Sequence, residues 1–180
     1  MSAMPSLLTV GILEPRKNQA CLLEVCEALW EDGLMFELNI VGRVNPHFGQ
    51  PVVREIARLQ QRGRAVRHHE GVNDETLLKL YRGARATVFP TVAEGCGLPV
   101  IESLWMGVPC VCSDLPVLRE NTEDGGCAVA ALNDRAAWKR ELKRVLIDDA
   151  WIDGLREAAG KRVLPTWRQT AEMLRRGLEG

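Results

Sequence analysis

Short apolar runs and longer amphipathic stretches alternate along the whole sequence. Short apolar runs are typical of buried strands, and apolar residues three and four positions apart are typical of one helix face. By this pattern, strands are predicted at 7–13, 36–41, 65–70, 86–89, 108–112 and 127–131. Helices are predicted at 19–31, 52–61, 74–82, 98–106, 134–146, 151–162 and 167–178, with a short helix or turn at 115–120. Because strands and helices alternate, we expect an α/β fold: a Rossmann-like, doubly wound parallel sheet with helices on both faces.

Residues at several helix ends support these boundaries. Asn18 precedes the first helix and is placed to cap it with its side chain. Thr166 and Gln169 have the capping-box spacing at the start of the last helix. Pro99 suits the first turn of the helix at 98–106, and Gly107 suits its end. These signals predict that the helices begin and end close to the limits of the apolar pattern.

The segment 86–112 reads as one strand–loop–helix–strand unit and carries most of the candidate chemistry. Glu94 lies in the loop at the carboxyl end of the strand, and Glu102 lies about one turn into the helix. Gly95 and Gly97 let the backbone approach a ligand and leave N–H groups free to point at it. Amides and a helix N-terminus suit phosphate, whereas carboxylates suit hydroxyl groups, so the unit suits a nucleotide. Glu102 stands among apolar positions, where burial without a partner would be costly, and a bound ligand would resolve that conflict.

Two cations, Arg16 and Lys17, directly follow the first predicted strand. Because ligands of open parallel sheets bind at the carboxyl ends of the strands, these cations suit the diphosphate of a nucleotide sugar. An Arg-Lys pair is also common as two solvated loop cations, and Glu94 could be a helix-capping or solvated group. On the residues alone, both alternatives stay open.

The spacing Glu94-x7-Glu102 lies within EGCGLPVIE and is followed by MGVPCVCSD. This segment resembles the signature of the family 4 glycosyltransferases, which are retaining, nucleotide-sugar-dependent enzymes of the GT-B fold. The resemblance extends from Gly11 to about Leu178 and corresponds only to the C-terminal half of such an enzyme. It implies that residues 1–180 form a single donor-binding domain with C-terminal helices, and that the N-terminal, acceptor-binding domain is absent.

The resemblance also implies a role for each candidate residue. Glu94 would lie at the transferred sugar, and Arg16 and Lys17 would hold the diphosphate; these three are the expected catalytic residues. Glu102 would bind the 2′- and 3′-hydroxyls of the ribose. The other expected substrate-binding residues around the start of the helix are Gly95, Cys96, Gly97, Leu98 and Pro99. Val72, in the turn at 71–73, would contact the base.

Two positions depart from the residues usual in the family. Ile12 stands where many relatives carry an arginine, which puts the strength of phosphate binding in question. Cys96 stands where an aromatic residue is usual, which puts the local packing in question. Cys96 could also act as a nucleophile, because a helix N-terminus lowers the pKa of a thiol, but this is a minor alternative.

The resemblance implies transfer of a sugar, with retention, to a saccharide or glycolipid acceptor, without a metal or other cofactor. GDP-mannose is the expected donor. The isolated chain is expected to bind the donor weakly and to transfer little or nothing, because the acceptor site belongs to the missing half. Two alternatives remain: a non-catalytic nucleotide-sugar-binding module, and one subunit of a two-chain glycosyltransferase. A plain Rossmann or response-regulator-like domain is disfavoured, because neither G-x-G-x-x-G nor an acidic cluster follows the first strand.

Length, charge and hydropathy narrow the possible classes of protein. The 180 residues suit one α/β domain, and a formal net charge of −1 argues against non-specific nucleic-acid binding. Neither a signal peptide nor an 18-residue apolar run is present, so we expect a cytoplasmic chain without a transmembrane segment. The full-length enzyme could still be peripheral to a membrane.

The cysteines, histidines and tryptophans are expected to be structural. Six cysteines without a C-x-x-C pair are predicted to be reduced core thiols, with Cys110 and Cys112 on one strand face. A zinc site or a disulfide framework is the minor alternative. The three histidines lack metal-ligand spacing: His47, His68 and His69. The five tryptophans lie at helical positions and are expected to pack rather than to stack on a sugar: Trp30, Trp105, Trp138, Trp151 and Trp167.

Overall fold

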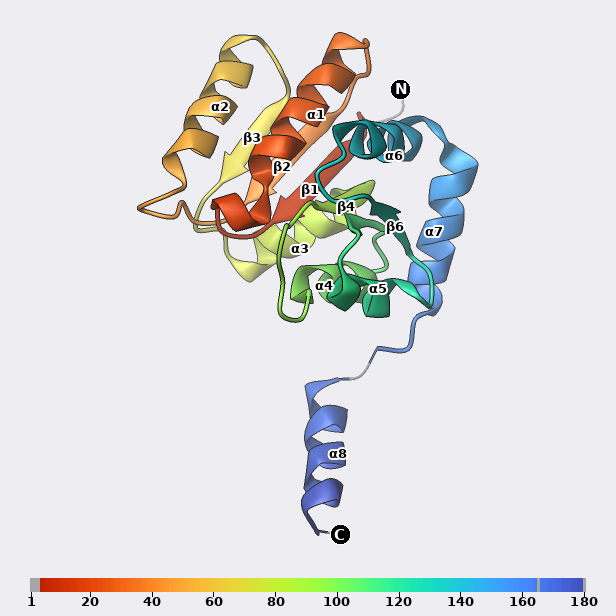
Figure 1. Ribbon diagram of the computed structural model, residues 1–180. Helices are drawn as coiled ribbons and strands as arrows, with labels where there is room; N and C mark the ends of the chain where they lie inside the picture. The colour runs from red at the N-terminus through yellow and green to blue at the C-terminus, as the bar shows by residue number, and fades with distance from the viewer. Residues whose placement is uncertain (1–3, 165, 180) are drawn as a thin grey trace.

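The computed structural model describes residues 4–164 and 166–179, and its central element is a sheet of six parallel strands (Figure 1). The strands are β1 (Ser6–Val10), β2 (Glu37–Val41), β3 (Val66–His69), β4 (Ala86–Phe89), β5 (Cys110–Ser113) and β6 (Cys127–Ala130). Their order in the sheet is β3-β2-β1-β4-β5-β6, so the direction of winding reverses between β1 and β4. The predicted α/β fold with a doubly wound parallel sheet is confirmed.

Two layers of helices cover the sheet. One face carries α1 (Gln19–Glu31), α2 (Gln50–Gln61) and α6 (Arg135–Ile147). The other carries α3 (Asp74–Gly83), α4 (Leu98–Trp105) and α5 (Pro116–Thr122). Beside β6, α7 (Asp149–Lys161) contacts both α6 and α4 and so joins the two layers (Figure 1). The 3-10 turn η1 (Pro15–Lys17) precedes α1, and α8 (Trp167–Glu179) comes last.

Alternate strand residues pack against opposite helix layers. Leu7 belongs to the hydrophobic cluster under α1, α2 and α6, whereas the next residue, Leu8, belongs to the cluster under α3. All four residues of β4, and all four of β5, are buried. Strands covered on both faces read as continuous apolar runs, which explains why the sequence pattern located them.

Two of the five tryptophans are buried, two are exposed, and Trp151 is partly buried. Trp138 is fully buried, and Trp30 stacks on Phe36 with 4.8 Å between the ring centroids. Trp105 on α4 and Trp167 on α8 are 54% and 83% exposed. The packing prediction is therefore wrong for these two side chains, because helical position alone does not say which face of a helix is covered.

The two predicted helix caps have different outcomes. Asn18 takes a left-handed conformation with φ of 55° and makes no side-chain cap bond, so this cap prediction is wrong. Its N–H instead donates to Pro15 O at 3.0 Å, because α1 starts directly from the turn η1. The capping box of α8 is confirmed. Thr166 N donates to Gln169 Oε1 at 2.8 Å, and Gln169 N donates to Thr166 Oγ1 at 3.2 Å.

The last helix, α8, lies apart from the sheet and its covering helices (Figure 1) and buries no residue. Trp167, Leu174 and Leu178 recur at helical spacing and are 66% to 83% exposed, so they form one apolar stripe. Within the described ranges, no helix has the length and apolar character needed to cross a membrane.

The ends of β1 and β2 approach each other so closely that Gly42 cannot carry a side chain. A Cβ atom there would lie 1.9 Å from Gly11 O. We therefore predict that Gly42→Ala lowers the free energy of unfolding by roughly 1–3 kcal/mol, because the backbone of the β1 loop would have to shift. Urea unfolding followed by circular dichroism measures this loss.

Gly154→Ala is the matched control, since this exposed glycine of α7 has nothing within 4 Å of an added Cβ. It should stabilise the helix by about 0.5–1 kcal/mol. Equal stabilities of the two variants would contradict the predicted close approach of β1 and β2.

Candidate functional site

The loops that follow β1 and β4 meet at the point where the sheet order reverses. Val92 N donates to Arg16 O at 2.9 Å, which joins the two loops through their backbones. The buried Thr91 adds a second link, with Oγ1 3.0 Å from the same carbonyl oxygen. In doubly wound sheets this crevice, outside the carboxyl ends of the central strands, is where ligands bind.

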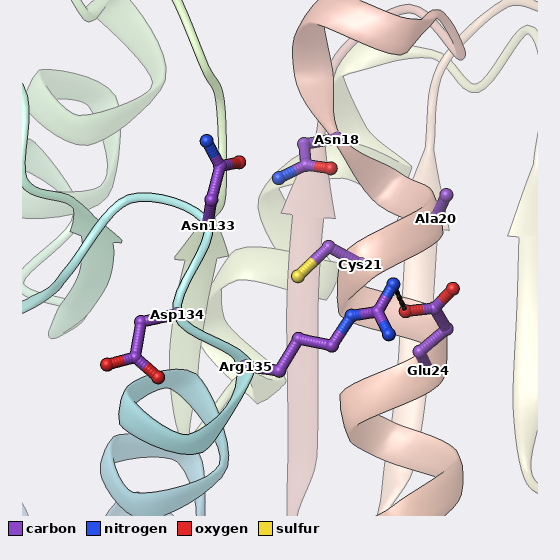
Figure 2. Close-up of a pocket in the computed structure, with 7 residues that line it drawn as sticks. All are labelled: Asn18, Ala20, Cys21, Glu24, Asn133, Asp134 and Arg135. Carbon is purple, nitrogen blue, oxygen red and sulfur yellow. Dashed lines mark ion pairs between the residues drawn. The ribbon is translucent and has the colours of Figure 1, made fainter.

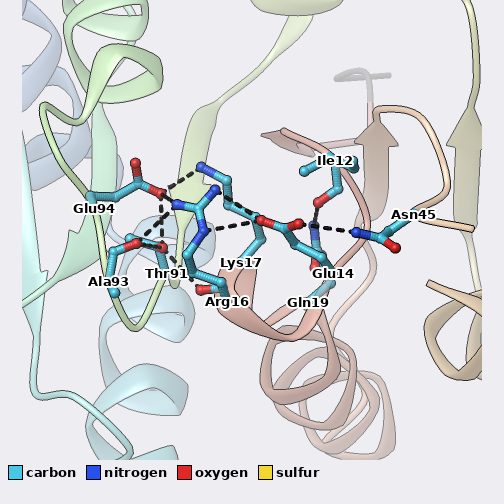
Figure 3. Close-up of polar contacts among 9 residues, drawn as sticks. All are labelled: Ile12, Glu14, Arg16, Lys17, Gln19, Asn45, Thr91, Ala93 and Glu94. Atoms are coloured by element: carbon cyan, nitrogen blue, oxygen red, sulfur yellow. Dashed lines mark hydrogen bonds and ion pairs between the residues drawn. The ribbon is translucent and has the colours of Figure 1, made fainter. Parts of the chain in front are cut away.

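The carboxylate of Glu94 holds both predicted cations at this crevice (Figure 3). Its Oε1 atom lies 2.7 Å from Arg16 Nη1, 2.5 Å from Lys17 Nζ and 3.0 Å from Thr91 Oγ1. The side chains of Glu94 and Lys17 are only 9% and 11% exposed, whereas that of Arg16 is 44% exposed. We call these three charged residues the Glu94 cluster. The structure thus brings together the three residues predicted to be catalytic, and they are not isolated solvated charges.

Neighbouring groups hold the two cations of the Glu94 cluster in place. Lys17 Nζ lies 4.9 Å from the centroid of the Phe89 ring, at the end of β4. Arg16 also pairs with Glu14 at 2.8 Å, and Glu14 accepts a hydrogen bond from Asn45 Nδ2 at 3.3 Å (Figure 3). Two carboxylates therefore balance two cations. The two cations need negatively charged partners, and a bound anion could take the place of Glu94 in that role.

The second predicted carboxylate, Glu102, is exposed on α4 and accepts a hydrogen bond at Oε2 from Tyr81 Oη at 3.2 Å. The cost of burying this carboxylate among the apolar residues of α4 therefore does not arise, because the side chain faces outward. Tyr81 on α3 is 3% exposed. Burial, with the nearby charge of Glu102, raises the pKa of the Tyr81 hydroxyl, so it stays protonated and donates. Tyr81 therefore fixes one oxygen of an otherwise solvent-facing carboxylate.

The start of α4 is shaped by packing against α5. Gly97 has φ of 73°, and an added Cβ would lie 2.4 Å from Leu118 Cδ2. Asn121 on α5 also donates from Nδ2 to Cys96 O at 3.1 Å. Gly97 is thus needed for helix packing, a reason the sequence did not reveal. Gly95, by contrast, has nothing within 4 Å of an added Cβ.

The first turn of α4 has no side-chain cap. Pro99 has no N–H and the Val100 N–H donates to Gly97 O at 2.9 Å, so Gly97 and Leu98 are the residues whose N–H groups could face an anion here. Leu98 is 48% exposed, Cys96 is exposed, and Pro99 is half-buried in the first turn. Val72 packs instead against the hydrophobic cluster that contains Tyr81, on the α3 side of the crevice.

The residues that sequence reasoning missed are Glu14, Asn45, Thr91 and Tyr81. Each is a common residue type without a distinctive neighbour pattern in the sequence. Their contacts depend on which strands are adjacent, and the sequence pattern did not give the strand order.

A separate open hollow of about 630 Å³ lies between the N-terminal ends of α1 and α6 (Figure 2). Its lining mixes polar and apolar groups and includes the ion pair of Arg135 and Glu24 at 2.6 Å. None of the predicted site residues lines it.

The histidines make structural contacts. His68 Nε2 lies 2.8 Å from Gly42 O, and His69 Nε2 lies 2.6 Å from Asn39 Oδ1. Among the described residues, no group of three His, Cys, Asp or Glu side chains could hold a metal ion.

Comparison with known proteins identifies mannosyltransferases among the relatives. The O-antigen chain mannosyltransferase B of Escherichia coli is 35% identical over 163 residues, which cover 90% of this chain and 41% of that protein. The serotype-specific mannosyltransferase WbdA of Escherichia coli is 33% identical over 124 residues, 69% of this chain and 15% of that protein. The chain thus spans less than half the length of these relatives.

Solved glycosyltransferase structures share the fold. Sucrose-phosphate synthase from Thermosynechococcus elongatus has a TM-score of 0.80 at 23% identity, covering 98% of this chain and 46% of that chain. The catalytic domain of cholesterol-α-glucosyltransferase from Helicobacter pylori has a TM-score of 0.71 at 16% identity, covering 87% and 95%. The architecture is therefore the Rossmann-like half of a GT-B fold. The profile of the family described as "Glycosyl transferases group 1" matches residues 4–148, and the chain belongs to this family.

Proposed function

We propose that this chain binds the nucleoside-diphosphate-sugar donor of a retaining hexosyltransferase, and that the donor is GDP-mannose. The observation that carries this proposal is the Glu94 cluster, in which Arg16 and Lys17 are held at the crevice between β1 and β4. The names of the mannosyltransferase relatives support mannose as the sugar.

In the proposed complex, the diphosphate takes the place of Glu94 as the partner of the two cations. Each cation interacts with a phosphate charge by roughly 4 kcal/mol at about 4 Å and an effective dielectric constant of about 20. The backbone donors at the start of α4, from Gly97 and Leu98, add to this anion site. Because these groups already supply positive charge, binding needs no metal ion or other cofactor.

The sugar and the nucleoside occupy the two sides of the anion site. Glu94, released from its cations, accepts hydrogen bonds from hydroxyls of the transferred sugar, next to Gly95 and Cys96. Glu102 accepts hydrogen bonds from the two ribose hydroxyls, while Tyr81 keeps its carboxylate oriented. The base lies near Val72.

Transfer follows when an acceptor hydroxyl attacks the anomeric carbon from the face that the diphosphate leaves. The carbon–phosphate-oxygen bond breaks, the new glycosidic bond forms, and the hydroxyl proton passes to the departing phosphate. Arg16 and Lys17 stabilise the charge that develops on the leaving group. Attack on the same face retains the anomeric configuration.

We further propose that the acceptor, a saccharide or glycolipid, is bound by a domain outside this sequence, in a cytoplasmic enzyme. The greater length of the relatives and the exposed apolar stripe of α8 support this arrangement. The chain by itself then binds the donor and transfers little or nothing.

Glu102→Gln tests the ribose contact. It keeps the shape of the side chain but removes the charge, so the affinity for GDP should fall by roughly 10- to 100-fold. Calorimetric titration with GDP and UDP measures the loss and identifies the preferred base. Glu172→Gln on the exposed face of α8 is the control and should bind as the unaltered chain does. Unchanged GDP affinity in Glu102→Gln would contradict the assignment.

Lys17→Met tests the diphosphate contact. The change keeps the length of the side chain but removes the ammonium group that lies over the Phe89 ring, so GDP affinity should fall by roughly 10- to 100-fold. Binding of guanosine, which has no phosphate, should be unaffected. The control is Lys79→Met, whose exposed lysine pairs only with Glu75 among the described residues. Equal losses for GDP and guanosine would instead indicate damage to the fold.

A further inference from the structure

Three cysteine thiols lie on neighbouring strands, next to the strand that leads to the Glu94 cluster. Cys110 and Cys112 are on β5, and Cys127 is on β6. Cys110 and Cys112 belong to the hydrophobic cluster beneath α4 and α5, Cys127 packs against it, and all three are free thiols. The proposed glycosyl transfer uses none of them.

The strand register brings two of these thiols into a geometry that a disulfide can span. Cys110 is the direct partner of Cys127 in the parallel pair of β5 and β6, whereas Cys112 is opposite Val129. Neighbouring strands are about 4.8 Å apart, and directly paired residues project to the same face of the sheet. Disulfides form at Cα separations of roughly 4.4–6.8 Å, so Cys110 and Cys127 are the matched pair.

The two thiols differ in their exposure to solvent. Cys127 is half-buried, whereas Cys110 is 1% exposed. Beside Cys127, the guanidinium of Arg162 donates to Gly125 O at 3.1 Å, and its side chain is only 8% exposed.

The surroundings shift the pKa values of the two thiols in opposite directions. Hydrogen bonds with Cys110 and Cys112, helped by the charge of Arg162, lower the pKa of the Cys127 thiol. Hydrogen bonds with Cys112 and Cys127, together with burial, raise the pKa of the Cys110 thiol. The accessible member is therefore the better nucleophile, and its protonated neighbour is placed to resolve an oxidised intermediate.

We propose that Cys127 and Cys110 form an oxidisable dithiol, in which Cys127 reacts first with a small peroxide and Cys110 then closes a disulfide. The Cys127 thiolate attacks one oxygen of hydrogen peroxide, the O–O bond breaks, and hydroxide leaves, which gives a sulfenic acid. The Cys110 sulfur attacks the Cys127 sulfur, loses its proton, and releases the oxygen as water. Peroxide is the oxidant, and the two thiols supply both electrons.

The disulfide would tie the edge strand β6 to β5 beneath α4, the helix that carries Glu102. The three cysteines are not placed to bind a metal ion, because in the described part of the chain no group of three His, Cys, Asp or Glu side chains could hold one.

Non-reducing peptide mapping after peroxide treatment tests the proposal. The folded chain is treated with hydrogen peroxide, its remaining thiols are alkylated in denaturant, and it is digested with trypsin. Cleavage after Arg85, Arg119 and Arg135 gives peptide 86–119, with Cys96, Cys110 and Cys112, and peptide 120–135, with Cys127. We expect these two peptides to be linked, and the alkylatable thiols to fall from six to four.

Fragment ions within 86–119 locate the bond on the unaltered protein. Cys112→Ala should keep the link, whereas Cys110→Ala should lose it and leave a sulfenic acid on Cys127 that dimedone traps. A bond from Cys127 to Cys112 or Cys96 would overturn the assigned pair. Oxidation of Cys127 no faster than that of the buried helix thiols Cys21 and Cys26 would overturn the proposed reactivity.

Discussion

The ion pairs of Glu94 with Arg16 and Lys17 are the interaction on which the rest of this site depends. Arg16 and Lys17 follow β1, and Glu94 follows β4, which lies beside β1 in the sheet although 77 residues separate Lys17 from Glu94. The side chains of Glu94 and Lys17 are largely out of water, so each charge needs its partner. A ligand that offers the cations a stronger anion can therefore bind only by rearranging this cluster.

The chain order of the elements followed from the sequence because β4 and β5 are covered on both faces and read as apolar runs. The pattern could not predict where tertiary contacts override local preferences. Asn18 has the residue type of a helix cap, but the preceding turn fixes it in a left-handed conformation. Trp105 has helical spacing within an apolar helix, but that spacing does not reveal which face remains uncovered.

The candidate site was predictable where chemistry is concentrated in a short segment. Glu94 and Glu102 flank a glycine-containing turn, and Arg16 with Lys17 follows the first strand, so both groups stood out. Thr91 and Tyr81 did not, because their importance comes from contacts made across the fold. The surroundings of Glu102 were not predictable either, because whether it faces solvent and which tyrosine orients it depend on how α3 and α4 pack.

A crystal structure of the chain with bound GDP is the most direct test of donor binding at the Glu94 cluster. We expect the diphosphate in the crevice between β1 and β4, with Arg16 Nη1 and Lys17 Nζ bonded to diphosphate oxygens instead of Glu94, and with the ribose hydroxyls on Glu102. GDP bound elsewhere, for example in the hollow between α1 and α6, with the Glu94 cluster intact, would contradict it.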